Sequence, residues 1–347
     1  MTVFVLGAGA SKELGLPTGD ELKSAIARDV DIRFKLGHTQ ESGSYEICEA
    51  FRALARKQQQ QQGINNYIRA CWKIRDALPQ AISIDNFIDA RSDDPLIAVA
   101  GKLGIATSIL AAEAASKLAV NPQNGNSAPN FSALSSTWHN SFFQLLTENC
   151  KREDLPDRLA RVALVVFNYD RCVEVFLLQA LKNYYTIDES EALQLLRRVE
   201  IHHPYGVVGG LPGLSSGTST PFGTTPHPTE LLAISNEIKT FTEGTDESAS
   251  HVRRIRELMS QCHRTVFLGF AYHRLNMQLL YKKPSGLLPL NVRNIYGTAL
   301  SLSASDVGII SHEISRYAET DVGNVQLRND LTCHGLFREY WRSMALN

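Results

Sequence analysis

The sequence has few cysteines and no close pair among them. Its 347 residues include six cysteines, and no two of these lie within four residues of each other. A structural zinc site normally needs a close pair such as C-x-x-C, because one turn of chain then supplies two thiolate ligands. The sequence therefore predicts no zinc module and no metal site. Dispersed thiols of this kind are typical of reduced side chains in a cytoplasmic protein.

The chain also lacks an excess of charge of either sign and a long apolar run. Lysine and arginine number 35 and aspartate and glutamate 36, which gives a net charge of −1. Such a chain has no bulk field that attracts nucleic acid or an anionic membrane. The first apolar run ends at Gly7 without a basic segment before it, and no run reaches about 18 residues. We expect no signal peptide, no membrane span and no direct binding of nucleic acid.

What the sequence does contain is a recurring pattern of apolar segments that end in glycine, asparagine, aspartate or histidine. Segments that are apolar on both faces are typical of strands inside a parallel sheet. The predicted fold class is therefore α/β, with a parallel sheet flanked by helices. The segments predicted as strands are residues 2–6, 161–170, 199–206, 264–273 and 292–302.

Helical patterns fill the long stretch between the first two predicted strands. Residues 18–29 predict a helix in which Thr18 is the N-cap and Glu21 completes a capping box. Residues 31–159 contain amphipathic and alanine-rich segments and no predicted strand. We therefore expect a single domain over residues 1–347, with a core formed by 1–30 and 160–347 and a helical insertion at 31–159.

Four of the predicted strands end in glycine or polar residues of the kinds that bind ligands or take part in catalysis. In an open parallel sheet, ligands bind in the crevice outside the carboxyl ends of the strands. The segments expected to meet at this crevice are residues 7–11, 168–170, 202–206 and 269–273.

The first of these segments, Gly7-Ala8-Gly9-Ala10-Ser11, lets the backbone approach a pyrophosphate and donate N–H groups to it. The ordinary dinucleotide fingerprint has a third glycine where this chain has Lys12, and no G-K-[ST] follows as in a P-loop. The segment predicts a nucleotide site outside both motifs. The alternative is a tight strand–helix turn that holds no ligand.

The second segment follows a buried strand and contains Asn168 and Asp170. An asparagine offers both donors and an acceptor, so Asn168 can orient a ribose or a water. Asp170 can accept from a ribose hydroxyl, or it can cap the helix that starts at Arg171. Both interpretations of Asp170 remain open from the sequence.

The third segment contains His202 and His203, and a histidine there can act as a general base near neutral pH. Adjacent strand residues point to opposite faces, so only one of the two is expected to face the crevice. Tyr205 is a further polar candidate. In the fourth segment, Gly269 and Phe270 permit close approach to an adenosine, or Gly269 serves only as a turn residue.

Taken together and in this order, the four segments resemble the sirtuin-like family, in its prokaryotic branch of NAD-cleaving proteins. GAGAS with KELGLPTGDEL is similar to the family's GAG-x-S loop and the Gly-Ile/Leu-Pro segment after it. FNYD is similar to its Asn-x-Asp motif, HPYG to its histidine-containing strand end, and LGFAYHRLN to its late glycine motif.

The resemblance implies a Rossmann-like domain that binds NAD across the crevice and cleaves the nicotinamide–ribose bond as an NAD⁺ nucleosidase. It implies that Asn168 holds the ribose and the attacking water, and that His203 removes a proton. It also implies an antiphage-defence effector that depletes NAD, acting as a homo-oligomer or with a second defence protein. The residues expected to bind the nucleotide are Gly7, Ala8, Gly9, Ala10, Ser11, Thr18, Asp170, Tyr205, Gly269 and Phe270.

The chain departs from the family pattern at two points. The paired cysteines of the protein-deacylating members are missing, which favours NAD hydrolysis over peptide deacylation. The family's histidine stands immediately before the glycine, and Tyr205 occupies that position here. We assign the histidine role to His203, with His202 as the alternative. The product can be linear or cyclic ADP-ribose.

Two other functions remain open on the same residues. The HPYG variant is compatible with a catalytically silent subunit that binds NAD or ADP-ribose in a larger complex. An NAD-dependent deacylase is the weaker alternative. Lys12, together with the lack of an acidic residue closing a second strand near position 30, disfavours a classical oxidoreductase.

Overall fold

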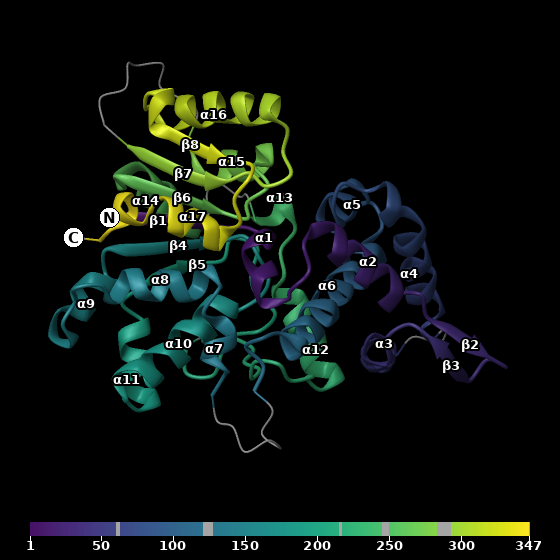
Figure 1. Cartoon of the computed structure of the whole chain (residues 1–347). Coiled ribbons are helices and arrows are strands. Elements are labelled where there is room, and N and C mark those ends of the chain that lie inside the picture. The colour runs from purple at the N-terminus through teal and green to yellow at the C-terminus, as the bar shows by residue number, and fades with distance from the viewer. Residues whose placement is uncertain (60–62, 121–127, 215–216, 245–249, 283–292, 347) are drawn as a thin grey trace.

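A parallel sheet forms the centre of the molecule in a computed structural model (Figure 1). The structure describes residues 1–59, 63–120, 128–214, 217–244, 250–282 and 293–346. Within these residues, six strands pair in the order β5-β4-β1-β6-β7-β8, and all neighbouring pairs are parallel. Numbered along the chain, this is the 3-2-1-4-5-6 order of the Rossmann fold. The predicted α/β class with a Rossmann-like sheet is confirmed. The strands are β1 (Thr2–Leu6), β4 (Val162–Val166), β5 (Glu200–His202), β6 (Arg264–Leu268), β7 (Asn294–Thr298) and β8 (Val325–Arg328).

The central strand β1 is apolar on both faces from Val3 to Leu6, which is the pattern of a strand inside the sheet. Val3 and Val5 join one apolar cluster, whereas Phe4 and Leu6 join another on the opposite face. This alternation follows from the two-residue period of a strand. Because both faces are covered, every residue of β1 is buried.

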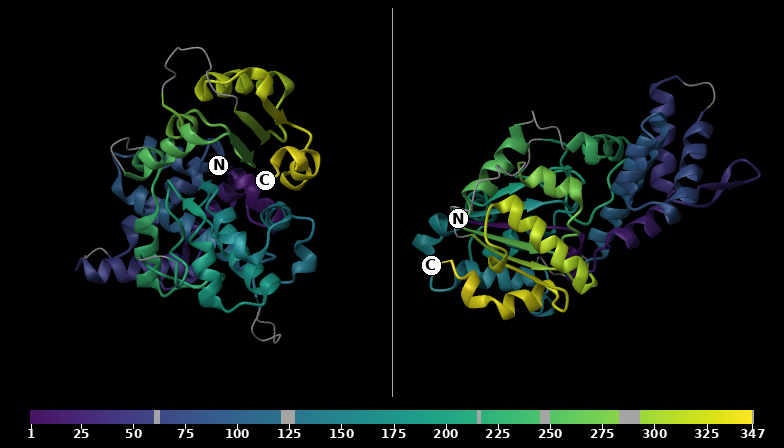
Figure 2. Two further views of the ribbon diagram at one scale, coloured as in Figure 1. Left: turned by 90° about the vertical axis from the view of Figure 1, so that its left-hand side faces the viewer. Right: turned by 90° about the horizontal axis from the view of Figure 1, so that it is seen from above.

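Helices cover both faces of the sheet. The face of Phe4 and Leu6 packs against one set of helices, and the face of Val3 and Val5 packs against another (Figures 1 and 2). The first set comprises α8 (Trp138–Thr147), α9 (Leu155–Leu159), α10 (Cys172–Tyr185), α11 (Glu189–Leu196), α17 (Cys333–Glu339) and α18 (Trp341–Met344). The second comprises α14 (Ser250–Gln261), α15 (Arg274–Leu280) and α16 (Ala304–Ala318).

A separate helical layer lies beyond the carboxyl ends of the strands (Figures 1 and 2). Its helices pack on one another around α6, and α12 joins them from a distant part of the sequence. By contrast, α8 and α9, which also fall within residues 31–159, pack on the sheet. The layer consists of α2 (Gly19–Asp29), α3 (Tyr45–Lys57), α4 (Asn65–Ala77), α5 (Ile84–Ala90), α6 (Pro95–Ala115) and α12 (Pro228–Glu237).

The expectation that residues 31–159 contain no strand is wrong. β2 (Arg33–Lys35) and β3 (Thr39–Ser42) form an antiparallel hairpin that projects from the helical layer (Figure 1). Both strands are short and mostly polar, none of their residues is fully buried, and only Phe34 packs against the core. A strand of this kind lacks the apolar alternation by which strands are recognised in a sequence.

Helix α6 is, by length and composition, the one helix among the described residues that could cross a membrane. Just over half of its most apolar window, 56%, is buried inside the molecule. It contacts α2, α3, α4 and α12. These contacts are those of a helix packed in the core of the molecule.

The five predicted strands are all present: β1 matches its predicted range, and the other four are shorter than predicted. β5 covers only residues 200–202, and the predicted strand at 292–302 begins at Asn294, with residue 292 outside the described residues. The sixth strand, β8, was not predicted. The helix predicted at 18–29 is α2, and the Glu21 carboxylate accepts from the Thr18 N–H at 2.8 Å, which confirms the capping box.

Candidate functional site

The glycine segment after β1 forms a short helix that packs directly on the loop after β6. Residues Ala8–Ser11 form α1. The Gly7 N–H donates to the Leu268 carbonyl and the Gly9 N–H donates to the Gly269 carbonyl, both at 3.0 Å. A Cβ on Gly7 would lie 2.5 Å from the Gly269 carbonyl oxygen. The close approach that these glycines permit in this structure is therefore between two backbone segments, as in the tight-turn interpretation. Phosphate binding by the segment stays a prediction.

Substitution of Gly269 by alanine is expected to destabilise the fold by at least about 2 kcal/mol. Gly269 has a φ of +55°, and its Cβ would lie 2.0 Å from the Ala10 nitrogen, a backbone atom that cannot rotate away. Urea unfolding of Gly269→Ala measures the loss. The matched control is Gly308→Ala in α16, where a Cβ meets nothing within 4 Å and alanine is the better helix former. Equal stabilities for the two variants would contradict the close contact.

Asn168, Ser11 and Asp170 form a buried hydrogen-bond network at the carboxyl ends of β1 and β4. The Asn168 Nδ2 donates to the Ser11 Oγ at 3.0 Å, and the Ser11 hydroxyl donates to the Asp170 Oδ2 at 2.8 Å. The Asp170 Oδ1 accepts from the Cys172 N–H at 3.1 Å, so Asp170 satisfies the first N–H of α10 although Arg171 is the N-cap residue. The Asn168 Oδ1 is buried and has no hydrogen-bond partner among the described residues. This oxygen is the unpaired acceptor of the network.

His203 lies next to this network and is held at both ring nitrogens. Its Nε2 lies 2.6 Å from the Glu174 Oε1, and its Nδ1 lies 3.3 Å from the Asn168 carbonyl oxygen. Burial lowers the pKa of His203, but the Glu174 carboxylate, the Asn168 carbonyl and Asp170 together more than offset this, and the pKa lies above the ordinary 6.5. His203 and Glu174 also line a cavity of about 260 Å³ between β5, α10 and α11.

His202 is separated from this group. Its Nε2 lies 2.8 Å from the Glu200 Oε1, and Glu200 is in turn paired with Arg254 of α14. Of the two candidate histidines, His203 contacts Asn168 and His202 contacts Glu200, as expected for adjacent residues of an extended segment that point to opposite faces.

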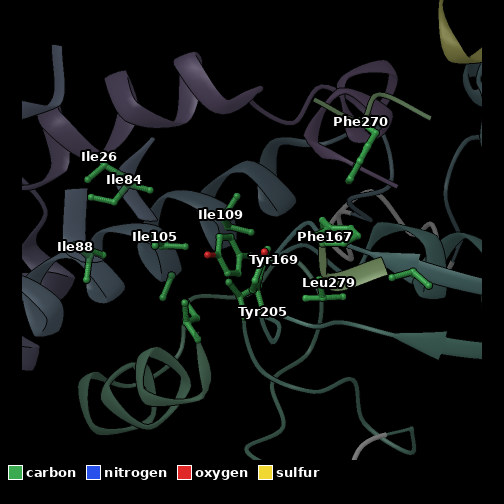
Figure 3. Packing of buried hydrophobic residues seen from close by; sticks show 14 of the residues in the cluster. Ile26, Ile84, Ile88, Ile105, Ile109, Phe167, Tyr169, Tyr205, Phe270 and Leu279 are labelled. Carbon is green, nitrogen blue, oxygen red and sulfur yellow. The ribbon is translucent and has the colours of Figure 1, made fainter. Parts of the chain in front are cut away.

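Tyr205 is buried in an aromatic and polar environment rather than open to a crevice. Its hydroxyl donates to the Asn276 Oδ1 at 2.6 Å, and its ring packs against Phe167 and Phe241. Burial raises the pKa of the Tyr205 hydroxyl, so it stays protonated. Phe270 packs on Phe167 at a ring distance of 5.1 Å (Figure 3).

The remaining predicted nucleotide-binding residues have structural partners of their own. The Thr18 hydroxyl donates to Glu21 at the start of α2, away from the network. The Ala10 N–H donates to the Gly7 carbonyl, and the Ala10 carbonyl accepts from the Trp138 indole at 2.7 Å. Ala8 is half-buried in the first turn of α1.

Two buried contacts tie the helical layer to the segment after β4. The Arg171 guanidinium forms an ion pair with Glu113 of α6, and it also donates to the Thr220 carbonyl. Both charged side chains are at most 1% exposed. On the other side, the Tyr169 hydroxyl donates to the Asp85 carboxylate of α5, and Figure 3 shows Tyr169 beside Tyr205.

The Asp85 contact predicts a pH-dependent stability. Burial raises the pKa of Asp85 from 3.8 to about 6, although the Tyr169 hydroxyl opposes this. The folded state therefore binds this proton more tightly than the unfolded chain, and the contribution of Asp85 becomes less favourable as pH rises from about 4 to 6. Asp85→Asn removes that term. Between pH 4.5 and pH 7.5, the free energy of unfolding of Asp85→Asn, measured in urea, should therefore rise by about 2 kcal/mol relative to that of the wild type. An unchanged difference at the two pH values would contradict the burial of this carboxyl group.

Sequence reasoning missed Glu174, Asn276, Asp85 and Glu113 as partners of the site. Glu174 follows Asp170 by one helical turn, which places it on the first turn of α10 near the strand end. This spacing was the available signal. Asp85 and Glu113 come from the helical layer, and no local pattern indicates which strand end they meet.

No group of three or more histidine, cysteine, aspartate or glutamate side chains in the described part of the chain could hold a metal ion. All six cysteines are free, and burial raises the pKa of Cys71 to about 12. A second cavity, of about 600 Å³, lies between α2 and α6 beside Lys12, and Asn168 does not line it. The sequence matches no protein-family model and no curated protein.

Proposed function

We propose that this chain is a sirtuin-like NAD⁺ glycohydrolase that binds NAD at the carboxyl ends of β1, β4 and β6. The observation that carries the proposal is the unpartnered, buried Oδ1 of Asn168. A buried polar atom without a partner costs free energy unless a ligand or water satisfies it. Asn168 follows β4, which pairs with β1, the strand at which the strand order reverses and beside which Rossmann-type sheets bind nucleotides.

The chemistry assigned to the site is hydrolysis of a glycosidic bond. The bond between the ribose C1′ and the nicotinamide nitrogen breaks, and its electron pair neutralises the pyridinium ring. Water adds to C1′, and its proton passes to a base, the role proposed for His203. Asn168 would orient the ribose or the water through the Oδ1. The products are nicotinamide, ADP-ribose and a proton.

The site is closed in this structure, which supports an effector whose activity is released by a partner or by assembly. Asn168 is 7% exposed and Ser11 is 4% exposed. The Arg171–Glu113 and Tyr169–Asp85 contacts join the helical layer to the segment that follows β4, at the carboxyl ends of the strands. A dinucleotide that reaches Asn168 therefore requires part of this layer to move. We propose that a defence-system partner or self-assembly provides that movement.

A direct assay tests the proposal. The purified protein, alone and with the products of neighbouring genes, is incubated with NAD, and nicotinamide and ADP-ribose are separated by chromatography. Equal amounts of both products support the proposal. No cleavage under any of these conditions contradicts it.

One observation favours the second candidate, a silent subunit that binds NAD or ADP-ribose. Tyr205 stands at the position of the family's histidine, and its hydroxyl is bound to Asn276. A silent subunit would show thermal stabilisation by NAD or ADP-ribose without turnover. The same samples therefore distinguish the two candidates.

A further inference from the structure

We infer that Glu174 is a positioning residue that holds His203 in its doubly protonated form and keeps it from acting as a base until one proton leaves. The catalytic part of this inference rests on the proposed function. The protonation state of His203 can be measured without it.

The first step is the geometry of the pair. Glu174 lies in the first turn of α10, and His203 directly follows β5. Their side chains meet at 2.6 Å, and each is 12% exposed. The Glu174 Oε2 is buried and has no partner among the described residues. Within the described part of the chain, this carboxylate therefore makes one hydrogen bond, to His203, in surroundings where charges are weakly screened.

The second step concerns the other ring nitrogen. The Nδ1 faces the Asn168 carbonyl oxygen at 3.3 Å, at the long end for an N–H···O bond. A neutral imidazole has one nitrogen without a proton, and that lone pair would face either this carbonyl or Glu174. Only the imidazolium donates at both positions. In this arrangement His203 has no lone pair with which to accept a proton.

The third step is the set of other charges around the ring. Asp170, which precedes α10, also raises the pKa of His203. Arg171 and Arg197 line the same cavity as His203, and both would oppose a second positive charge. Arg171 is paired with Glu113, whereas Arg197 donates to the Gly213 carbonyl. Glu174 is thus the carboxylate in contact with the ring, and the cavity gives the proton a route to solvent.

The decisive measurement is the titration of His203 by NMR in full-length protein labelled with ¹⁵N-histidine. His203→Gln identifies the resonance among the ten histidines. In the wild type, His203 should titrate above the ordinary midpoint of about 6.5. In Glu174→Gln, which keeps the shape and removes the charge, the midpoint should fall by at least about one pH unit, a tenfold loss of proton affinity.

The matched control is Glu200→Gln, which removes the carboxylate from the neighbouring pair with His202. It should leave the His203 midpoint unchanged. Unchanged resonances of the other nine histidines in Glu174→Gln show that the fold is intact. A His203 midpoint that moves by less than about 0.3 pH units in Glu174→Gln overturns the inference.

The pH profile of NAD cleavage supplies the catalytic arm. Turnover should rise with pH through the His203 midpoint, and in Glu174→Gln this rise should move to lower pH by the same amount. A profile that stays in place while the NMR midpoint moves overturns the catalytic part. If the wild type cleaves no NAD at any pH, the proposed function fails, and the titration alone decides whether Glu174 holds the proton.

Discussion

Asn168→Ala is expected to lower the rate of NAD cleavage at least about 100-fold, the usual effect of deleting one positioned polar group at a reacting centre. The variant removes the Oδ1, which has no partner among the residues that the structure describes, and the Nδ2, which donates to Ser11. Loss of the Ser11 hydrogen bond should cost only about 1 kcal/mol of stability. The expected result is therefore a folded protein with little activity. Chromatographic measurement of nicotinamide release, with urea unfolding of the same sample, checks both parts.

The control carries the same substitution on an exposed asparagine. Asn86 lies on α5 and is exposed, and Asn86→Ala should retain wild-type turnover. If Asn168→Ala cleaves NAD at the wild-type rate, the reacting centre lies elsewhere. If the variant loses both activity and fold, Asn168→Ser, which keeps a small polar group, separates the two effects.

The second large effect concerns the ion pair between Arg171 and Glu113. Arg171→Met should reduce the free energy of unfolding by about 3–5 kcal/mol, because it leaves the Glu113 carboxylate buried without its partner. That carboxylate accepts from both the Arg171 N–H at 3.0 Å and the guanidinium Nε at 3.1 Å, and it is fully buried. Urea unfolding at pH 7 measures the loss.

The double variant separates charge from packing. Replacing both partners in Glu113→Met/Arg171→Met removes the unpaired charge, so its stability should return to within about 2 kcal/mol of the wild type. The Thr220 carbonyl still loses its donor, which explains a residual loss. The single variant Glu113→Met completes the comparison. If the stability losses of Arg171→Met and Glu113→Met simply add in the double variant, the two residues do not act as a pair.

The fold could be predicted from the sequence where strands are apolar on both faces. β1, β4 and β6 are buried along nearly their whole length, and their apolar runs identify them. β8 is an edge strand of four residues, VQLR, in which only alternate residues are buried. β8 and the polar hairpin of β2 and β3 contain too few apolar residues to be recognised as strands from the sequence. Their positions depend on contacts made by the folded chain.

The candidate site could be predicted where its residues come from strand ends. Ser11, Asn168 and Asp170 were expected at one crevice, and the structure brings them together. The closure of that crevice could not be predicted. It depends on Asp85 and Glu113, whose partners lie more than 50 residues away in the sequence.

The sheet order also determines when this protein can fold during synthesis. β1 is made first, but its partners in the sheet are residues 162–166 and 264–268. At about 5–20 residues per second, a ribosome needs on the order of ten seconds or more before β4 emerges. Meanwhile α2, α3, α4 and α6 are already complete and make contacts close in sequence. These helices can assemble early, whereas the central strand cannot pair until its long-range partners are made, and until then no sheet covers its apolar residues.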